Sequence, residues 1–331
     1  MTNTPVHEGA CPELGFEHTV ARSLVHRRNL SELFLTDGVR LDSAHFAAAA
    51  QLPMIHYYYT DHLTDERVDP LLLLECCRQA ETHAMHAHFG APLDTKFVLR
   101  SWSLRLDDAH GDRGAAPHEF TATAETSLAR WRGGELRGQR YDMALFLDQA
   151  PIGQVRMDVG YLRGAVYAAM RERKRGGLPP SSAEFTADAA ADLVKPHLVG
   201  RSNADNVLLL APRFTADRIV ARLRVHGSHP SLFDHPQDHV PGMVLMEGAR
   251  QLGVLAAKHF AGIPAHELGI VGMAAEFDAY AELDAPVELL CSEPVAGADG
   301  ESRISIRFVQ HGSVIARATF DVRCGAVREA A

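Results

Sequence analysis

Two long apolar segments dominate the hydrophobic pattern, and each predicts a buried helix. Residues 243–257 are apolar almost all round apart from Glu247, Arg250 and Gln251, and a helix of that composition is buried. The preceding Pro241-Gly242 predicts its start, because proline suits the first helical turn, where its missing N–H is not needed. At 3.6 residues per turn, the three polar side chains share one face of this helix.

The same pattern occurs earlier in the chain, around Leu71, Glu75, Arg78 and Gln79. An Asp-His motif precedes each segment, as Asp61-His62-x-x-Asp65 and as Asp234-His235-x-x-Asp238. The two copies are offset by about 172 residues. That length is typical of a whole domain and too long for a solenoid repeat. We therefore expect a duplicated domain with a polar site in each half.

Alternating apolar and polar positions predict antiparallel strands beside each helix. Near the end of the chain Ile304, Ile306 and Phe308 alternate with polar residues, a turn falls at His311-Gly312, and the alternation then resumes over residues 314–322. The first copy repeats this hairpin around a turn at residues 151–153. One long helix beside several antiparallel strands, twice over, predicts an α+β fold.

The expected organisation has four parts. A lead-in covers residues 1–20, a first domain 21–170, a linker 171–194 and a second domain 195–331. The linker is indicated by the basic run 171–175 and by the Gly-, Pro- and Ser-rich stretch that follows it, because such residues favour turns.

Composition narrows the classes of function. The formal net charge of −9 provides no basic field for a nucleic-acid backbone. No apolar stretch is long enough to span a bilayer, so we expect no membrane association and a cytoplasmic protein. Five cysteines, with Cys76 and Cys77 adjacent, favour reduced thiols. A histidine cluster at 83–88 leaves a metal site as a minor alternative, but it has no match in the second copy, and we expect neither a metal nor a cofactor.

The Glu/Arg pair on each buried helix has two interpretations. It can neutralise itself and do no chemistry, or it can belong to a reactive site. The Asp-His loop favours the second interpretation, because it can bring His235 and Asp238 to the mouth of a pocket beside Glu247. A glutamate whose pKa is raised by apolar surroundings can act as a general base beside an imidazole. The free N–H groups of Gly242 and Met243 can hold a carbonyl oxyanion.

Residues 233–251, with their Asp-His, Pro-Gly and Glu-x-x-Arg-Gln elements, resemble the signature of the A-factor biosynthesis family, the bacterial gamma-butyrolactone signalling synthases. Residues 69–79 are similar to that family's first repeat, and the resemblance extends from about residue 24 to 322. It implies two hotdog domains, each a long helix wrapped by an antiparallel sheet. It also implies transfer of a β-ketoacyl chain from acyl carrier protein to a hydroxyl of dihydroxyacetone phosphate.

The Pro-Gly-x-x-x-x-Glu portion also resembles hotdog 3-hydroxyacyl-carrier-protein dehydratases, whose paired His and Glu fall on His235 and Glu247. In the transfer reaction these two residues are expected to take the proton from the attacking hydroxyl, while the N–H groups of Gly242 and Met243 stabilise the oxyanion. Arg250 suits the substrate phosphate, given its charge and its fork of donors. Further substrate contacts are expected from Gln251, Asp238 and His239.

In the first copy Glu75 is the candidate catalytic residue. The candidate substrate contacts there are Arg78, Gln79, Asp61 and His62. These residues can form a second site or complete the first one across the two halves. Residues 68–70 are Val-Asp-Pro, so the helix start differs from the Pro-Gly start of the second copy. We therefore expect the second copy to carry more of the chemistry.

Two other functions fit the same pattern. One is a dehydratase or thioesterase acting on 3-hydroxyacyl or other acyl thioesters. The other is a module that binds an acyl chain or lactone without turnover. The length and branching of the acyl chain, the final signalling product (a butyrolactone, furan or butenolide) and the formation of a homodimer stay open at this stage.

Overall fold

The computed structural model describes residues 13–62, 67–107, 116–185, 192–298 and 300–324. Asp65 of the first Asp-His motif lies outside these residues, as do part of the expected lead-in and part of the expected linker. In the described part of the chain, no helix is both long enough and apolar enough to cross a lipid bilayer.

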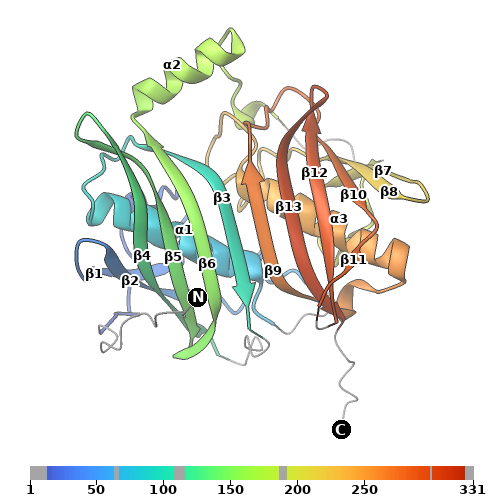
Figure 1. The fold of residues 1–331 in the computed structure, drawn as a ribbon, viewed down its shortest axis with the longest axis horizontal. Coiled ribbons are helices and arrows are strands. Elements are labelled where there is room, and N and C mark those ends of the chain that lie inside the picture. Colours follow the sequence, from blue (N-terminus) through green and yellow to red (C-terminus); the bar gives the residue numbers. More distant parts are fainter. Residues whose placement is uncertain (1–12, 63–66, 108–115, 186–191, 299, 325–331) are drawn as a thin grey trace.

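A single antiparallel sheet runs through the described residues (Figure 1). Its strands follow the order β1-β2-β4-β5-β6-β3-β9-β13-β12-β10-β8-β7, and β11 pairs with β12. The strands are β1 (Leu35–Arg40), β2 (His45–Leu52), β3 (Lys96–Leu106), β4 (His118–Arg132), β5 (Glu135–Leu147), β6 (Ala150–Leu162), β7 (Leu209–Phe214), β8 (Arg218–Leu223), β9 (Leu268–Phe277), β10 (Glu288–Ser292), β11 (Val295–Ala296), β12 (Glu301–Gln310) and β13 (Ser313–Cys324).

The two halves meet where β3 pairs with β9. This pairing runs from Ser101 opposite Glu276 to Arg105 opposite Gly272. It continues the hydrogen-bonded ladder from one half into the other, so neither strand is left as an open edge at the junction.

Two long helices, α1 (Pro70–Ala87) and α3 (Gly242–Ala261), lie behind the sheet in the view of Figure 1. Each half is therefore one long helix with its own antiparallel strands, which is the arrangement that the family resemblance implies. Short 3-10 helices lead into the strands; they are η1 (Arg22–Val25), η2 (Leu30–Glu32), η3 (Ser182–Glu184), η5 (Pro196–Val199), η6 (Ala204–Asn206) and η7 (Ala265–Glu267).

The predicted start of α3 and the hairpin near the end of the chain are confirmed. The first-copy hairpin is also present as β5 and β6, but its turn lies at residues 148–149 and not at 151–153, because Pro151 already pairs with Phe146 in the ladder. Helix α3 begins at Gly242 directly after Pro241, and α1 begins with a proline after Asp69, whose side chain accepts a hydrogen bond from the N–H of Leu71 at 2.8 Å. Strands β12 and β13 form the predicted hairpin, with its turn at His311-Gly312 in the left-handed region. Their alternate apolar residues are buried, as a sheet with one covered face requires.

Helix α2 (Gly164–Arg175) stands apart from the sheet at one end of the molecule (Figure 1). The basic run was expected to open a linker, but its residues form the end of this helix. Arg171 is fully buried and donates to the carboxylates of Asp238 at 3.2 Å and Glu282 at 2.7 and 2.8 Å. Its guanidinium also lies 4.3 Å from the ring centre of Tyr280. The run therefore attaches α2 to the second half.

We expect Arg171→Ala to lower the free energy of unfolding by about 2–3 kcal/mol, because two partly buried carboxylates lose their shared cation. The matched control is Arg173→Ala on the exposed side of the same helix, which should change stability by less than about 0.5 kcal/mol. Urea unfolding of both variants measures the difference. Equal effects would show that Arg171 does not hold α2 in place.

Candidate functional site

The Asp-His loops cross between the two halves. Asp234, from the second half, accepts hydrogen bonds from the backbone N–H groups of residues 28 and 29 at 2.7 Å each. Asp61, from the first half, accepts in the same way from residues 202 and 203 at 3.1 Å. The polar cluster around Glu75, here called the first-half centre, and the one around Glu247, the second-half centre, are each flanked by a loop of the opposite half.

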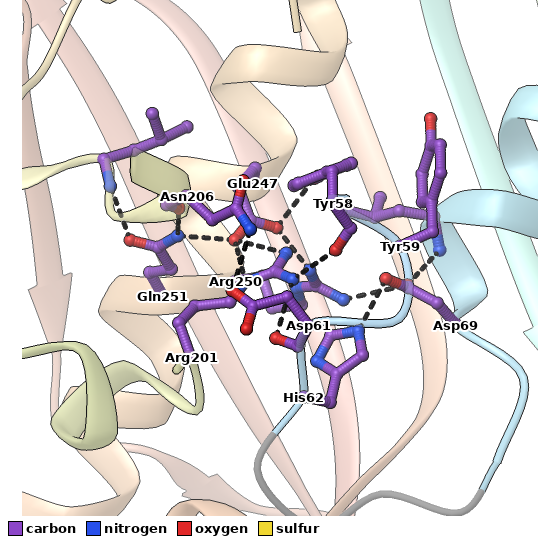
Figure 2. A network of polar contacts seen from close by, with 12 residues as sticks. Tyr58, Tyr59, Asp61, His62, Asp69, Arg201, Asn206, Glu247, Arg250 and Gln251 are labelled. Atoms are coloured by element: carbon purple, nitrogen blue, oxygen red, sulfur yellow. Dashed lines mark hydrogen bonds and ion pairs between the residues drawn. The ribbon is translucent and has the colours of Figure 1, made fainter. Parts of the chain in front are cut away.

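At the second-half centre, Glu247 is enclosed by donors (Figure 2). Arg201 donates to it at 3.0 and 2.8 Å, Tyr58 at 2.9 Å and Gln251 at 2.5 Å, and Arg250 forms an ion pair with it at 2.5 Å. Burial alone would raise the pKa of Glu247, but the two guanidiniums outweigh burial and lower it below its usual value. The structure thus corrects the expectation of a raised pKa, and Glu247 is an ionised carboxylate in a sealed network.

Asp69 completes that network from the first half (Figure 2). Arg250 donates to its Oδ1 at 2.8 Å, and the Nε2 atom of His62 lies 2.8 Å from its Oδ2. Only 7% of the Arg250 side chain is exposed. The expected contact of Arg250 with a substrate phosphate is therefore replaced in this structure by a contact with Asp69, and His62 serves the same closed network.

The first-half centre has the same core. Glu75 accepts from Arg78 twice at 2.8 Å, from Arg27 and from Gln79 at 2.7 Å. Burial opposes ionisation, but the two neighbouring guanidiniums prevail and hold the pKa of Glu75 at about 2. Glu75 is thus ionised at neutral pH, and its position suits a group that orients Arg78 better than it suits a base.

The two glutamines hold their helices to the segments that lead into the strands. Gln79 accepts from the backbone N–H of Phe34 at 3.0 Å, and Gln251 accepts from that of Leu208 at 2.8 Å. Both side chains are fully buried. The structure therefore gives Gln79 and Gln251 internal partners in the place of the expected substrate.

A cavity of about 730 Å³ lies beside the first-half centre. Its polar lining includes His26, Arg27, Arg78, Glu81, Thr82, Lys96, His235, Gln237, Asp238 and His239. Its apolar lining includes Phe97, Leu99, Trp102, Met157, Val159, Leu232, Met243 and Phe277. Helix α2 contributes Tyr167, Ala168, Arg171 and Lys174. Among the described residues, no three His, Cys, Asp or Glu side chains gather closely enough to hold a metal ion.

One difference in sequence explains why only the first-half centre opens onto this cavity. The residue that corresponds to Asp69 in the second copy is Pro241, which has no carboxylate. Arg78 corresponds to Arg250, which donates a hydrogen bond to Asp69. Because Pro241 stands in the place of Asp69, Arg78 lacks the equivalent hydrogen bond. The exposed fraction of its side chain is 25%, and it lines the cavity.

The start of helix α3 also faces the cavity. The first N–H groups of an α-helix have no partner within the helix, and Gly242 and Met243 both line the cavity. At the start of α1, by contrast, Pro70 has no N–H and Asp69 occupies the N–H of Leu71. Donors of the kind that can hold an oxyanion therefore lie at the start of α3, in the same cavity as Arg78 of the first half.

The predicted histidines of the second copy, His235 and His239, line the cavity. The Nδ1 atom of His235 lies 3.1 Å from Asp234, and Gln237 lies 2.6 Å from its Nε2. His239 contacts Asp238, whose pKa is lowered because the bonds with His239, Tyr167 and Arg171 outweigh burial. The structure does not bring His235 to Glu247, because the loops cross and Glu247 lies in the sealed centre of the other site.

Sequence reasoning missed Glu81, which lies one turn after Arg78 on α1. It is 1% exposed and lines the cavity, and Tyr161 donates to it at 2.8 Å. The signal was present as a further charged residue in an apolar helix. A search for features shared by the two copies passes over it, because Gly253 occupies the corresponding position.

We expect Asp69→Asn to lower the free energy of unfolding by about 3 kcal/mol or more, because it leaves a buried positive charge uncompensated at the second-half centre. Asp217→Asn is the control, since that carboxylate is 65% exposed and should contribute less than about 1 kcal/mol. Thermal and urea unfolding measure both. An Asp69→Asn protein as stable as the control would contradict the sealed network.

Comparisons with known proteins agree with this architecture. Residues 12–162 and 182–326 match the model of the A-factor biosynthesis hotdog domain. The chain is 36% identical to a 2-oxo-3-(phosphooxy)propyl 3-oxoalkanoate synthase of Streptomyces virginiae, over 88% of this chain and 93% of that protein, and 32% identical to one of Streptomyces griseus, over 89% and 91%. A putative oleoyl thioesterase from Lactobacillus plantarum shares the fold, with a TM-score of 0.51 at 9% identity over 86% of this chain and 98% of that one. The chain belongs to the A-factor biosynthesis hotdog domain family.

Proposed function

We propose that this protein is an acyltransferase that condenses a β-ketoacyl thioester, carried by acyl carrier protein, with a hydroxyl of dihydroxyacetone phosphate. The relatives' name describes the ester of those two parts. The product would be a precursor of a gamma-butyrolactone, furan or butenolide signalling molecule, and the reaction would take place in the cytoplasm.

The observation that carries the proposal is the pair of arginines at the first-half centre, both of which line the cavity. In the described part of the chain, Glu75 is the one carboxylate that forms ion pairs with Arg27 and Arg78. At the second-half centre, two carboxylates balance two guanidiniums. At the first centre no second carboxylate of the described residues forms an ion pair with Arg78, so its guanidinium can bind an anionic group in the cavity, such as a phosphate.

The rest of the cavity suits the acyl donor. Trp102, Met157 and Val159 provide an apolar wall for a hydrocarbon chain. The N–H groups of Gly242 and Met243 are placed to stabilise the oxyanion that forms when a hydroxyl attacks the thioester carbonyl. Phosphate, acyl chain and reacting carbonyl thus each have a distinct part of the lining.

The remaining candidate residues take supporting roles in this proposal. Glu75 orients Arg78, and His235, held by Asp234 and Gln237, offers a polar contact to the substrate. Asp238 and His239 line the cavity, and Asp238 accepts a hydrogen bond from Tyr167 of α2. The second-half residues Glu247, Arg250, Gln251, Asp61 and His62 maintain the closed centre that joins the two halves.

The direct test incubates the purified protein with a 3-oxoacyl thioester of acyl carrier protein, with and without dihydroxyacetone phosphate. We expect mass spectrometry to detect the phosphorylated ester, and the thioester to be consumed only when the phosphate is present. Thioester loss at the same rate without it would indicate a thioesterase. Loss of water from a 3-hydroxyacyl thioester would indicate a dehydratase, and binding without turnover would indicate an acyl- or lactone-binding module.

We expect Arg78→Gln to lower kcat/KM for dihydroxyacetone phosphate by about 10- to 100-fold, the usual effect of losing a charge-assisted hydrogen bond. Most of the change should appear in KM, because the phosphate is remote from the reacting carbonyl. Arg213→Gln, at a side chain 61% exposed on β7, is the control. An Arg78→Gln enzyme with an unchanged KM would place the phosphate elsewhere.

A further inference from the structure

Glu81 differs from the other buried acids that surround the two centres. Glu75, Glu247 and Asp69 each form an ion pair with an arginine. Among the described residues, no lysine, arginine or histidine forms an ion pair with Glu81, although its side chain is buried at the cavity wall. A buried carboxyl without a counterion is costly as an anion, so it gains or releases a proton near neutral pH.

A directed chain of hydrogen bonds ends at one oxygen of Glu81. The Nε2 atom of Gln139 can only donate, and it lies 2.6 Å from the Tyr141 hydroxyl. Tyr141 then donates its proton to Tyr161 at 2.6 Å, and Tyr161 donates to Oε1 of Glu81 at 2.8 Å. This chain fixes the carboxyl in position and stabilises its ionised form.

The second oxygen is arranged differently. Oε2 of Glu81 lies 3.2 Å from the hydroxyl of Thr82, whose proton has a closer acceptor in the backbone carbonyl of Arg78 at 2.8 Å. Oε2 can therefore carry a proton and donate it to Thr82, or release that proton and accept one from a molecule in the cavity. Both protonation states have hydrogen-bond partners.

The charged and titratable groups around Glu81 agree with this geometry. Burial is the largest influence and raises the pKa of Glu81 to about 7, against the opposing effects of the Tyr161 hydrogen bond and the positive charge of Arg78. Tyr141 faces the same carboxyl from β5, with its own proton donated to Tyr161. The corresponding position in the second half is a glycine, so the sealed centre has no such group.

We propose that Glu81 is the catalytic base of the transfer reaction, an inference that rests on the proposed function. Its carboxylate takes the proton from the hydroxyl of dihydroxyacetone phosphate as that oxygen bonds to the thioester carbonyl carbon. When the tetrahedral intermediate collapses, the C–S bond breaks and the protonated Glu81 returns the proton to the leaving thiolate. The products are an ester and a thiol, and Glu81 ends as it began.

The test compares Glu81→Gln with the wild-type enzyme over a range of pH. Because the base must be ionised, we expect wild-type kcat/KM to fall below a pH near 7 as Glu81 becomes protonated. Glu81→Gln should lower kcat by about 100- to 10,000-fold and abolish this acid limb, while calorimetry shows unchanged binding of dihydroxyacetone phosphate. Glu125→Gln, exposed on β4, is the matched control and should retain wild-type activity.

Tyr161→Phe provides a second and independent readout. It removes the hydrogen bond that favours the ionised form, so the acid limb should move to higher pH while the maximal rate is largely kept. This variant decides the question if Glu81→Gln fails to fold in a thermal melt.

A Glu81→Gln enzyme with wild-type kcat and an unchanged acid limb would overturn the proposal. So would a Tyr161→Phe enzyme whose acid limb does not move. If the wild-type protein forms no ester at any pH, the proposed function itself fails, and that result is distinct from the failure of Glu81 alone.

Discussion

A buried carboxylate at the centre of each half must be balanced by arginines, and much of the site's architecture follows from that requirement. Glu75 draws Arg27 and Arg78 into the interior, and Glu247 draws Arg201 and Arg250. One arginine of each set comes from the helix and the other from the segment before the first strand. The ion pairs therefore attach each long helix to the segment that precedes the first strand of its own half.

The charge balance also explains why the cavity of about 730 Å³ borders one of the two centres and not the other. Asp69 provides the second carboxylate at one centre, closes it and caps α1. Pro241 occupies the same place at the other centre, so Arg78 and the first N–H groups of α3 stay available. The sealed centre contributes stability, while the open one contributes the charge, the donors and the apolar wall that an acyl transfer requires. In the proposed reaction, the Asp69/Pro241 difference therefore assigns a structural role to one centre and a chemical role to the other.

The sequence predicts the fold well, because its signals are local. A nearly continuous apolar run after Pro241-Gly242 identifies α3, and alternating apolar and polar residues identify the strands beside it. The change at the start of the first helix is also visible in the sequence. The structural consequence of this change cannot be seen in the sequence, because Asp69 contacts an arginine 181 residues away. Spacing along the chain likewise cannot show that the Asp-His loops cross between halves, so it pairs His235 with Glu247. Glu81 is hidden for another reason: comparison of the copies emphasises what they share.

The central claim is that the protein has one working site per chain, at the first-half centre. The stoichiometry of dihydroxyacetone phosphate binding, measured by isothermal titration calorimetry without the acyl donor, tests it most directly. The account predicts about one molecule bound per chain, with binding weakened by Arg78→Gln and retained in Asp69→Asn. Two equivalent molecules per chain, or binding that depends on Asp69 and not on Arg78, would contradict it.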